Sequence, residues 1–260
     1  MSLKIGIYGY GVVGSALGNW LIENTGHSIL AVDPAKNLSP NMSSINVAFI
    51  CVPVPTDKDG TQNLETLKQV ASEVLGGVPI FVRSTVLPGT CRRLSIKLGR
   101  PVYSMPEFLT ERQAYQDMCD LPVLCGGGAE ILGRVFEGKK QIIEMENEEA
   151  ELAKYTHNCF AAVKVNYFNI IKSIADSMGC DYMTVLKGAM ITRFIEPTHT
   201  SVPGPDGKFG FGGKCLPKDL RAFASYAEQY RSIVEVLKEN DNFRDQTAEP
   251  FAWGSPVGEA

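Results

Sequence analysis

One cysteine of this chain lies in a segment whose neighbours suit covalent chemistry. The segment 208–219 places Cys215 after a stretch with three glycines and before a predicted helix, with Lys214 and Lys218 on either side. A thiol reacts as its thiolate, which nearby cations and a helix N-terminus favour. The glycines carry no side chain, so a ligand can approach the backbone closely. A buried structural cysteine is the alternative, but the lysines and glycines favour a nucleophile.

A lysine and an asparagine four residues apart form a second candidate pair. Lys154 and Asn158 lie in a stretch, 148–178, that contains no glycine or proline. Apolar residues at helical spacing predict one long helix there, and residues four apart share a face of it. Such a pair can polarise a substrate oxygen, and a solvated helix face is the alternative reading of the pair taken alone.

The start of the chain carries a glycine pattern at a predicted strand-to-helix corner. Residues 4–8 predict a buried strand, and an apolar helix follows the glycines. In dinucleotide-binding folds the first glycine makes the turn, the second admits the pyrophosphate, and the third lets the helix pack on the strand. The predicted cofactor contacts of this corner are Gly9, Tyr10, Gly11, Val12, Val13 and Gly14.

An acidic residue ends the second predicted strand, which covers residues 28–32. Asp33 follows Gly14 by 19 residues, about where a carboxylate meets the ribose 2′-hydroxyl. A carboxylate there would repel a 2′-phosphate, so the sequence predicts NAD in preference to NADP. The alternative is that Asp33 only caps a helix starting at Pro34. Two prolines before Asn46 predict a shortened connection in place of a full crossover helix.

The first half of the chain alternates predicted strands and helices. A helix is expected at 64–75, and further strands that complete one sheet are expected at 46–52, 79–83, 102–105, 121–125 and 141–144. Apolar strands in this alternation predict an α/β fold, a Rossmann-like doubly wound sheet followed by an all-α domain built on the long helix. Ligands bind beyond the carboxyl ends of such strands, which here means Pro53, Pro55, Thr56, Ser84 and Thr85.

The second half is predicted to be helical. Asp181 is expected to cap a short helix, and residues 216–238 to form the last one. The predicted domains are an NAD-binding domain at 1–146, a helical central domain at 147–240 and a tail at 241–260.

Composition restricts the class of protein. The chain has 260 residues, 44% of them hydrophobic, and a net charge of -4. The sequence has no basic stripe of the kind that would indicate a nucleic-acid partner. Its apolar runs are shorter than the ~18 residues of a membrane helix. The seven cysteines include no Cys-x-x-Cys pair, so no metal site and a reducing cytoplasm are expected.

Five segments, in this order, resemble the UDP-glucose/GDP-mannose dehydrogenase family: 9–14, 83–90, 106–109, 151–158 and 212–219. The resemblance covers residues 3–238, and its Pro-Glu-Phe-Leu and Cys-Leu-Pro-Lys-Asp segments are specific. It implies NAD-dependent oxidation of a nucleotide sugar (UDP-glucose-like) to the uronic acid, with four electrons removed through a thiohemiacetal and a thioester of Cys215, in polysaccharide biosynthesis. The family's C-terminal nucleotide-binding domain is expected to be lacking.

The resemblance also implies roles for individual residues. Lys154 and Asn158 would stabilise charge on the reacting oxygen, Asp219 and Thr85 would position water or that oxygen, and Glu107 would assist hydrolysis. Glu111 and Lys218 would join the cofactor contacts. The substrate contacts would be Glu107, Phe108, Leu109, Lys154, Asn158, Arg193, Phe209, Gly210, Phe211 and Gly212. The helix 148–178 would form the interface of a homodimer.

Two other functions stay open. A two-electron hydroxyacid dehydrogenase of the same superfamily would also use a Lys-x-x-x-Asn pair after a Rossmann domain, and Cys215 would then be incidental. A non-catalytic NAD-binding partner protein is the second alternative.

Overall fold

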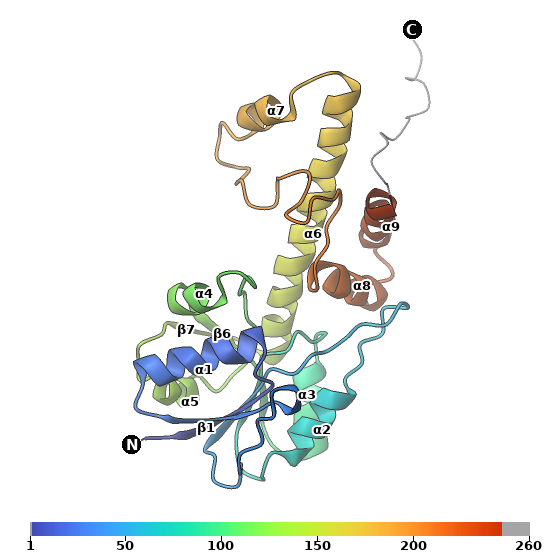
Figure 1. Ribbon diagram of the computed structural model, residues 1–260. Helices are drawn as coiled ribbons and strands as arrows, with labels where there is room; N and C mark the ends of the chain where they lie inside the picture. Colours follow the sequence, from blue (N-terminus) through green and yellow to red (C-terminus); the bar gives the residue numbers. More distant parts are fainter. Residues whose placement is uncertain (1, 246–260) are drawn as a thin grey trace. The chain divides into compact units, whose positions relative to one another are not determined.

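The computed structural model of the chain describes residues 2–245, which form two compact units that divide between Thr156 and His157 (Figure 1). The first unit is built on a parallel sheet of five strands in the order β2-β1-β3-β4-β5. Ile5 of β1 lies opposite Val47 of β3, and Ala48 lies opposite Ile80 of β4. The strands are β1 (Lys4–Tyr8), β2 (Ser28–Val32), β3 (Val47–Ile50), β4 (Ile80–Val82) and β5 (Val102–Ser104).

Helices cover both faces of this sheet, which is why its central strands are apolar without alternation. On one face Leu17 and Trp20 pack with Ile7 and Phe49 in a core that α1 (Val12–Asn24), α4 (Ala114–Asp120) and α5 (Ala129–Val135) share. On the other face Leu67 of α2 (Glu65–Glu73) and Leu94 of α3 (Thr90–Leu98) pack with Ile80. Each such side chain, once buried, contributes about 1.5–3 kcal/mol. The predicted α/β doubly wound fold is confirmed.

The connection from β2 to β3 is short, as predicted. It contains one 3-10 turn, η1 (Pro34–Lys36), and no crossover helix. The chain therefore leaves β1 toward β2 and returns on the other side of β1 to β3. Ligands bind at such a change of strand order in doubly wound sheets.

The prediction that two more strands complete the sheet is wrong. β6 (Val123–Cys125) and β7 (Ile142–Glu144) form a separate two-stranded parallel sheet. The reason is the side chain of Asn147, which accepts from the amide of Ser104 at 2.6 Å and donates to the carbonyl of Val102 at 3.0 Å. This carboxamide occupies the edge of β5 with which a sixth strand would pair.

The second unit is helical, and the long helix α6 (Asn147–Ser177) runs through the division between the units. Its bounds confirm the predicted helix 148–178 to within one residue. Asp181 caps α7 (Tyr182–Ala189) by accepting from the amide of Thr184 at 2.9 Å, as predicted. Phe168 and Ala175 of α6 pack against Tyr182 and Leu186 of α7 to form a small core.

The prediction of a single last helix over 216–238 is wrong. Two helices form, α8 (Leu216–Tyr226) and α9 (Arg231–Asp245), and the amide of Tyr230 closes a turn onto the carbonyl of Ala227 between them. No glycine or proline marks this break, so residue types alone do not indicate it. Residues 241–245 of the predicted tail belong to α9, and 246–260 lie outside the described residues.

The units divide inside α6, whereas the sequence analysis placed the domain boundary before this helix at 146. The first turns of α6 contribute Ala150 and Tyr155 to the interior of the first unit. Among the helices of residues 2–245, none has both the length and the hydropathy needed to cross a bilayer.

Candidate active site

The glycine corner connects β1 to α1 in the first unit. Gly9 has a φ of +88°, and a Cβ there would lie 2.7 Å from the carbonyl oxygen of Cys51, beyond β3. A Cβ on Gly14 would collide with the carbonyl oxygen of Gly9. A Cβ on Gly11 would meet nothing within 4 Å, and no side chain caps α1 at this residue. Two glycines are thus required by packing, and the middle one leaves the helix N-terminus open to an anion.

Asp33 lies against this corner, as its predicted role requires. Its carboxylate accepts from the amide of Tyr10 at 2.9 Å and from the amide of Ala35 at 3.1 Å, so it also caps η1. The ammonium of Lys36 donates to the carbonyl of Tyr10 at 2.6 Å. A carboxylate offers about four acceptor positions, which leaves two for the hydroxyls of a ribose. The corner and its acid therefore fit a dinucleotide with a free 2′-hydroxyl.

The other predicted cofactor residues of this unit follow β3 and β4. Pro53 and Pro55 are exposed, and the hydroxyl of Thr56 is buried without a hydrogen-bond partner among the described residues. Ser84 donates to the carbonyl of Val52 at 2.6 Å, which ties the two strand ends together. These residues border the carboxyl edge of the sheet, where the glycine corner also lies.

Gln62, which the sequence analysis did not single out, organises the loop of Thr85. Its amide nitrogen donates to the carbonyl of Thr85 at 3.2 Å and to the hydroxyl of Tyr155 at 2.8 Å. Its amide oxygen accepts from Leu87 at 3.0 Å. Gln62 thereby fixes this loop relative to the first turns of α6. A glutamine in a polar loop has no sequence pattern that reveals such a role.

Lys154 and Glu107 form a buried ion pair in the first unit. The side chains are 6% and 10% exposed, and Lys154 Nζ lies 3.3 Å from Glu107 Oε1 and also donates to the carbonyl of Glu107. The ammonium lies 5.2 Å from the ring centre of Phe108. Glu107 accepts from the amide of Leu109 at 2.6 Å with its second oxygen. The predicted segment 106–109 is thus folded around Lys154, while Glu111 is exposed.

In the second unit, Cys215 begins α8 and is exposed. Asp219, one turn later, is 1% exposed, and its amide donates to the carbonyl of Cys215 at 2.8 Å. The Asp219 carboxylate accepts from the side-chain amide of Asn158 at 2.7 Å and from the ammonium of Lys218. Three predicted catalytic residues of this unit, Cys215, Asp219 and Asn158, are therefore connected.

The remaining cysteines are poor nucleophiles or lie elsewhere. Of the seven, Cys180 and Cys215 are exposed. Burial raises the pKa of the thiols of Cys51 and Cys159 to about 12, that of Cys125 to about 11, and that of Cys91 well above its ordinary value. Asp219 adds to the shift at Cys159. These four side chains stay thiols at neutral pH. Of the other three, Cys119 lies near the C-terminal end of α4 and Cys180 is not the N-cap of a helix, whereas Cys215 is the N-cap of α8 and is therefore the candidate nucleophile.

The glycine loop before Cys215 is held from within the second unit. The amide of Gly210 donates to Asn169 Oδ1 at 2.8 Å, and the amide of Phe211 donates to Asn240 Oδ1 at 2.6 Å. The side chain of Phe211 is 2% exposed, so it packs in the protein interior, whereas the predicted role was contact with substrate. Phe209 is half-buried, and Gly212 lies close to Arg244.

Arg193 lies in an exposed turn after α7, with a φ of +58°. Its neighbours Ile191 and Phe194 are 83% and 90% exposed. The structure gives it no contact with the other predicted substrate residues of its unit.

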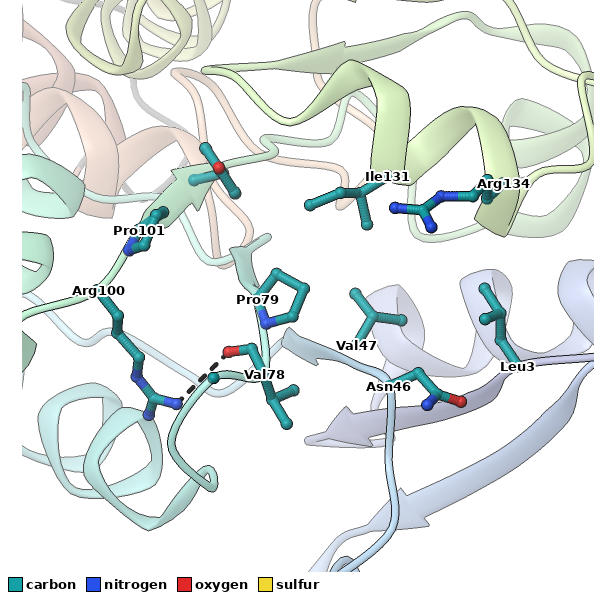
Figure 2. Close-up of a pocket in the computed structure, with 11 residues that line it drawn as sticks. Leu3, Asn46, Val47, Val78, Pro79, Arg100, Pro101, Ile131 and Arg134 are labelled. Carbon is teal, nitrogen blue, oxygen red and sulfur yellow. Dashed lines mark hydrogen bonds between the residues drawn. The ribbon is translucent and has the colours of Figure 1, made fainter.

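A hollow of about 460 Å³ lies at the opposite edge of the sheet, between the amino ends of β3–β5 and α5 (Figure 2). Asn46, Pro79 and Ile131 line it, and Arg134 points toward it. None of the predicted site residues lines this hollow. In residues 2–245, no three His, Cys, Asp or Glu side chains are grouped so that they could hold a metal ion.

The fold and the glycine corner define a dinucleotide-binding α/β domain that is followed by a helical domain carrying a candidate nucleophile. Residues 35–137 match the NAD binding domain, and residues 148–244 the central domain, of the UDP-glucose/GDP-mannose dehydrogenase family. The chain belongs to this family, and its cofactor is NAD, so both predictions are confirmed.

This chain spans only part of the length of the named relatives that it matches. A GDP-mannose 6-dehydrogenase of Pseudomonas putida is 29% identical over an alignment 281 positions long, gaps included, which covers 85% of this chain and 63% of that protein. The UDP-glucose 6-dehydrogenase YwqF of Bacillus subtilis is 29% identical over 76% of this chain and 48% of its own. The structure of a UDP-glucose dehydrogenase from Pyrobaculum islandicum has the same fold, with a TM-score of 0.79 at 24% identity over 93% of this chain and 68% of that one.

Proposed function

We propose that the protein oxidises the primary alcohol of a nucleotide sugar to the carboxylate of a uronic acid, with NAD as oxidant. The observation that carries this proposal is the exposed thiol of Cys215 at the start of α8, one turn from a buried Asp219 that Asn158 holds. A two-electron alcohol oxidation has no use for a thiol, whereas oxidation to the acid level gains a covalent route through a thioester.

When bound, each NAD accepts one hydride from the carbon being oxidised, so two NAD are reduced per sugar. The first oxidation removes a hydride and a proton from the alcohol and leaves an aldehyde. The sulfur of Cys215 adds to the aldehyde carbon, and the oxygen takes a proton to give a thiohemiacetal. Loss of a second hydride and the hydroxyl proton gives the thioester. Water then attacks the thioester carbon, and the thiol leaves with a proton.

Charge develops on the substrate oxygen during both the addition and the hydrolysis. Lys154 and Asn158 are one helical turn apart on α6, so their donors project from the same face. Fixed donors of this kind lower the barrier because they need no reorganisation as charge forms. Glu107, which already bonds Lys154, would take the proton of the attacking water, and Asp219 and Thr85 would orient the water or the reacting oxygen.

The substrate class is proposed from the relatives, which are named for GDP-mannose and UDP-glucose. The test is turnover of both nucleotide sugars with NAD, in which NADH and uronic acid are counted. Two NADH per uronic acid are expected. Cys215→Ser should abolish acid formation, and Cys180→Ser, which alters the other exposed cysteine, should retain it. One NADH per sugar with unchanged rates in Cys215→Ser would instead indicate a two-electron dehydrogenase.

We further propose a homodimer through α6 and a cytoplasmic location. Phe160, Tyr167 and Ile174, seven residues apart along α6, and Met178 just after it are 40–70% exposed, which supports a protein contact on this helix. The seven cysteines form no disulfide, in keeping with a reducing compartment. Light scattering of the wild type and of the double variant Phe160→Glu/Tyr167→Glu tests the dimer. The charged variant should have the mass of a monomer, and the wild type that of a dimer.

A further inference from the structure

Arg83 is a buried cation at the carboxyl end of β4. The residue is only 4% exposed, and its side-chain Nε has no hydrogen-bond partner among residues 2–245. Burial lowers the pKa of this guanidinium, and the neighbouring Cys51 and Glu107 raise it. A buried cation without compensation is costly, and a methionine of similar length would pack here without that cost. The charge itself therefore requires an explanation.

Glu107 is the carboxylate whose charge acts on Arg83. Both residues line a cavity of about 20 Å³ beyond the carboxyl ends of β4 and β5. That volume holds at most about one water molecule, so little solvent separates the two side chains. Asp117 is the other carboxylate in the wall, but it accepts two hydrogen bonds from Thr110, each at 2.7 Å.

The same carboxylate already binds Lys154, so the first unit contains a row of three charges. Glu107 Oε1 lies 3.3 Å from Lys154 Nζ. We propose that Arg83 is a positioning residue whose charge acts on the Glu107 carboxylate together with that of Lys154, across the cavity that Arg83 and Glu107 line, and so leaves the row with one net positive charge. Cys51 does not alter this sum, because burial raises the pKa of its thiol to about 12.

The net charge matters for the reaction proposed above, on which this inference rests. A lysine paired one-to-one with a carboxylate is largely neutralised. A second cation near that carboxylate restores a positive field at Lys154, in surroundings where water screens little. Such a field stabilises an oxygen that becomes negative as the reaction proceeds.

A stability experiment tests the row without turnover. Glu107→Gln should lower the urea midpoint, because it leaves two buried cations without a counter-charge. Adding Arg83→Met to that variant should recover part of the loss. The matched control is Asp117→Gln, which also removes a carboxylate of the cavity wall. Adding Arg83→Met to this variant should not recover the stability that it loses. Equal recovery in both backgrounds, or recovery in neither, would overturn the inference.

Kinetics then test the consequence for catalysis. In an active wild type, Arg83→Met should lower kcat at least about tenfold with KM within about twofold, while the thermal midpoint stays the same or rises. Arg83→Lys, which keeps the charge, should recover most of kcat. An unchanged kcat in Arg83→Met, or a lysine variant no better than methionine, contradicts the role. If the wild type shows no turnover but Arg83→Met still recovers part of the urea midpoint lost in Glu107→Gln, the proposed oxidation is refuted and the charge row stands.

Discussion

Glu151 joins α6 to the N-terminus of α3, and its removal should destabilise the first unit. The residue is 2% exposed, and its carboxylate accepts from the amides of Gly89 at 2.6 Å and Cys91 at 2.8 Å. Gly89 is the N-cap of α3 and has no side chain to satisfy these amides. The carboxylate therefore serves as the cap of a helix 60 residues earlier in the chain.

The magnitude follows from the two hydrogen bonds. Each bond to a charged acceptor contributes about 1.5–3 kcal/mol, and burial of the carboxylate offsets part of the sum. We expect Glu151→Ala to lower the free energy of unfolding by about 3 kcal/mol, which corresponds to roughly 6–12 °C in Tm for a unit of this size. Urea unfolding followed by circular dichroism measures the first quantity, and calorimetry the second.

Glu148 provides the matched control, one turn earlier on α6. Its carboxylate pairs with the exposed Arg92 at 2.7 Å, and such surface pairs contribute about 0–1 kcal/mol. Glu148→Ala should therefore change stability little. If Glu151→Ala were no more destabilising than Glu148→Ala, the assignment of Glu151 as the cap of α3 would be refuted.

The pH dependence of this effect has a definite sign. Burial raises the pKa of Glu151 above its ordinary 4.5, and the two amides only partly counter that shift. A raised pKa in the folded state means that folding disfavours the ionised form, so the stability linked to this protonation is full below about 4.5 and is lost as pH rises through the folded value, whereas the two hydrogen bonds to the carboxylate remain. Wild type should thus lose stability relative to Glu151→Gln as pH increases from that point, and the opposite slope would contradict the reasoning.

Three further predictions concern the two units separately. Gly11→Ala should fold normally but bind NAD about tenfold more weakly in a fluorescence titration, because a Cβ there meets no protein atom and would face the phosphates, whereas Gly76→Ala should bind as wild type. Gln62→Ala should lose about 2 kcal/mol in urea unfolding, since three hydrogen bonds around Thr85 are lost, and the exposed Gln69→Ala should lose almost none. Asn158→Ala should cost about 2 kcal/mol and lower kcat about 100-fold, because it removes the donor that holds buried Asp219; a kcat within threefold of wild type would argue against its role.

Features set by local pattern were predictable from the sequence. The glycine corner, the long helix α6 and the cap at Asp181 each rest on residue types a few positions apart, and the structure has them as expected. The shortened connection after β2 follows from its prolines in the same way.

Features set by contacts between distant residues were not predictable. Asn147 ends the sheet by bonding the edge of β5 from more than 40 residues away, and Gln62 holds Thr85 across 23. The loop that contains Phe211 is likewise held by side-chain acceptors of distant helices, Asn169 and Asn240. Polar side chains of this kind carry no periodicity, so only the folded chain reveals what they bond.

The two bonds that Asp33 makes inside the protein bear on any attempt to redesign cofactor preference. Changing this residue to remove its repulsion of a phosphorylated ribose would also release the amides of Tyr10 and Ala35. An alanine would therefore loosen the corner that binds the pyrophosphate, whereas asparagine or serine would keep an acceptor in place. A switch toward NADP in this scaffold has to supply a neutral acceptor and a new cation together.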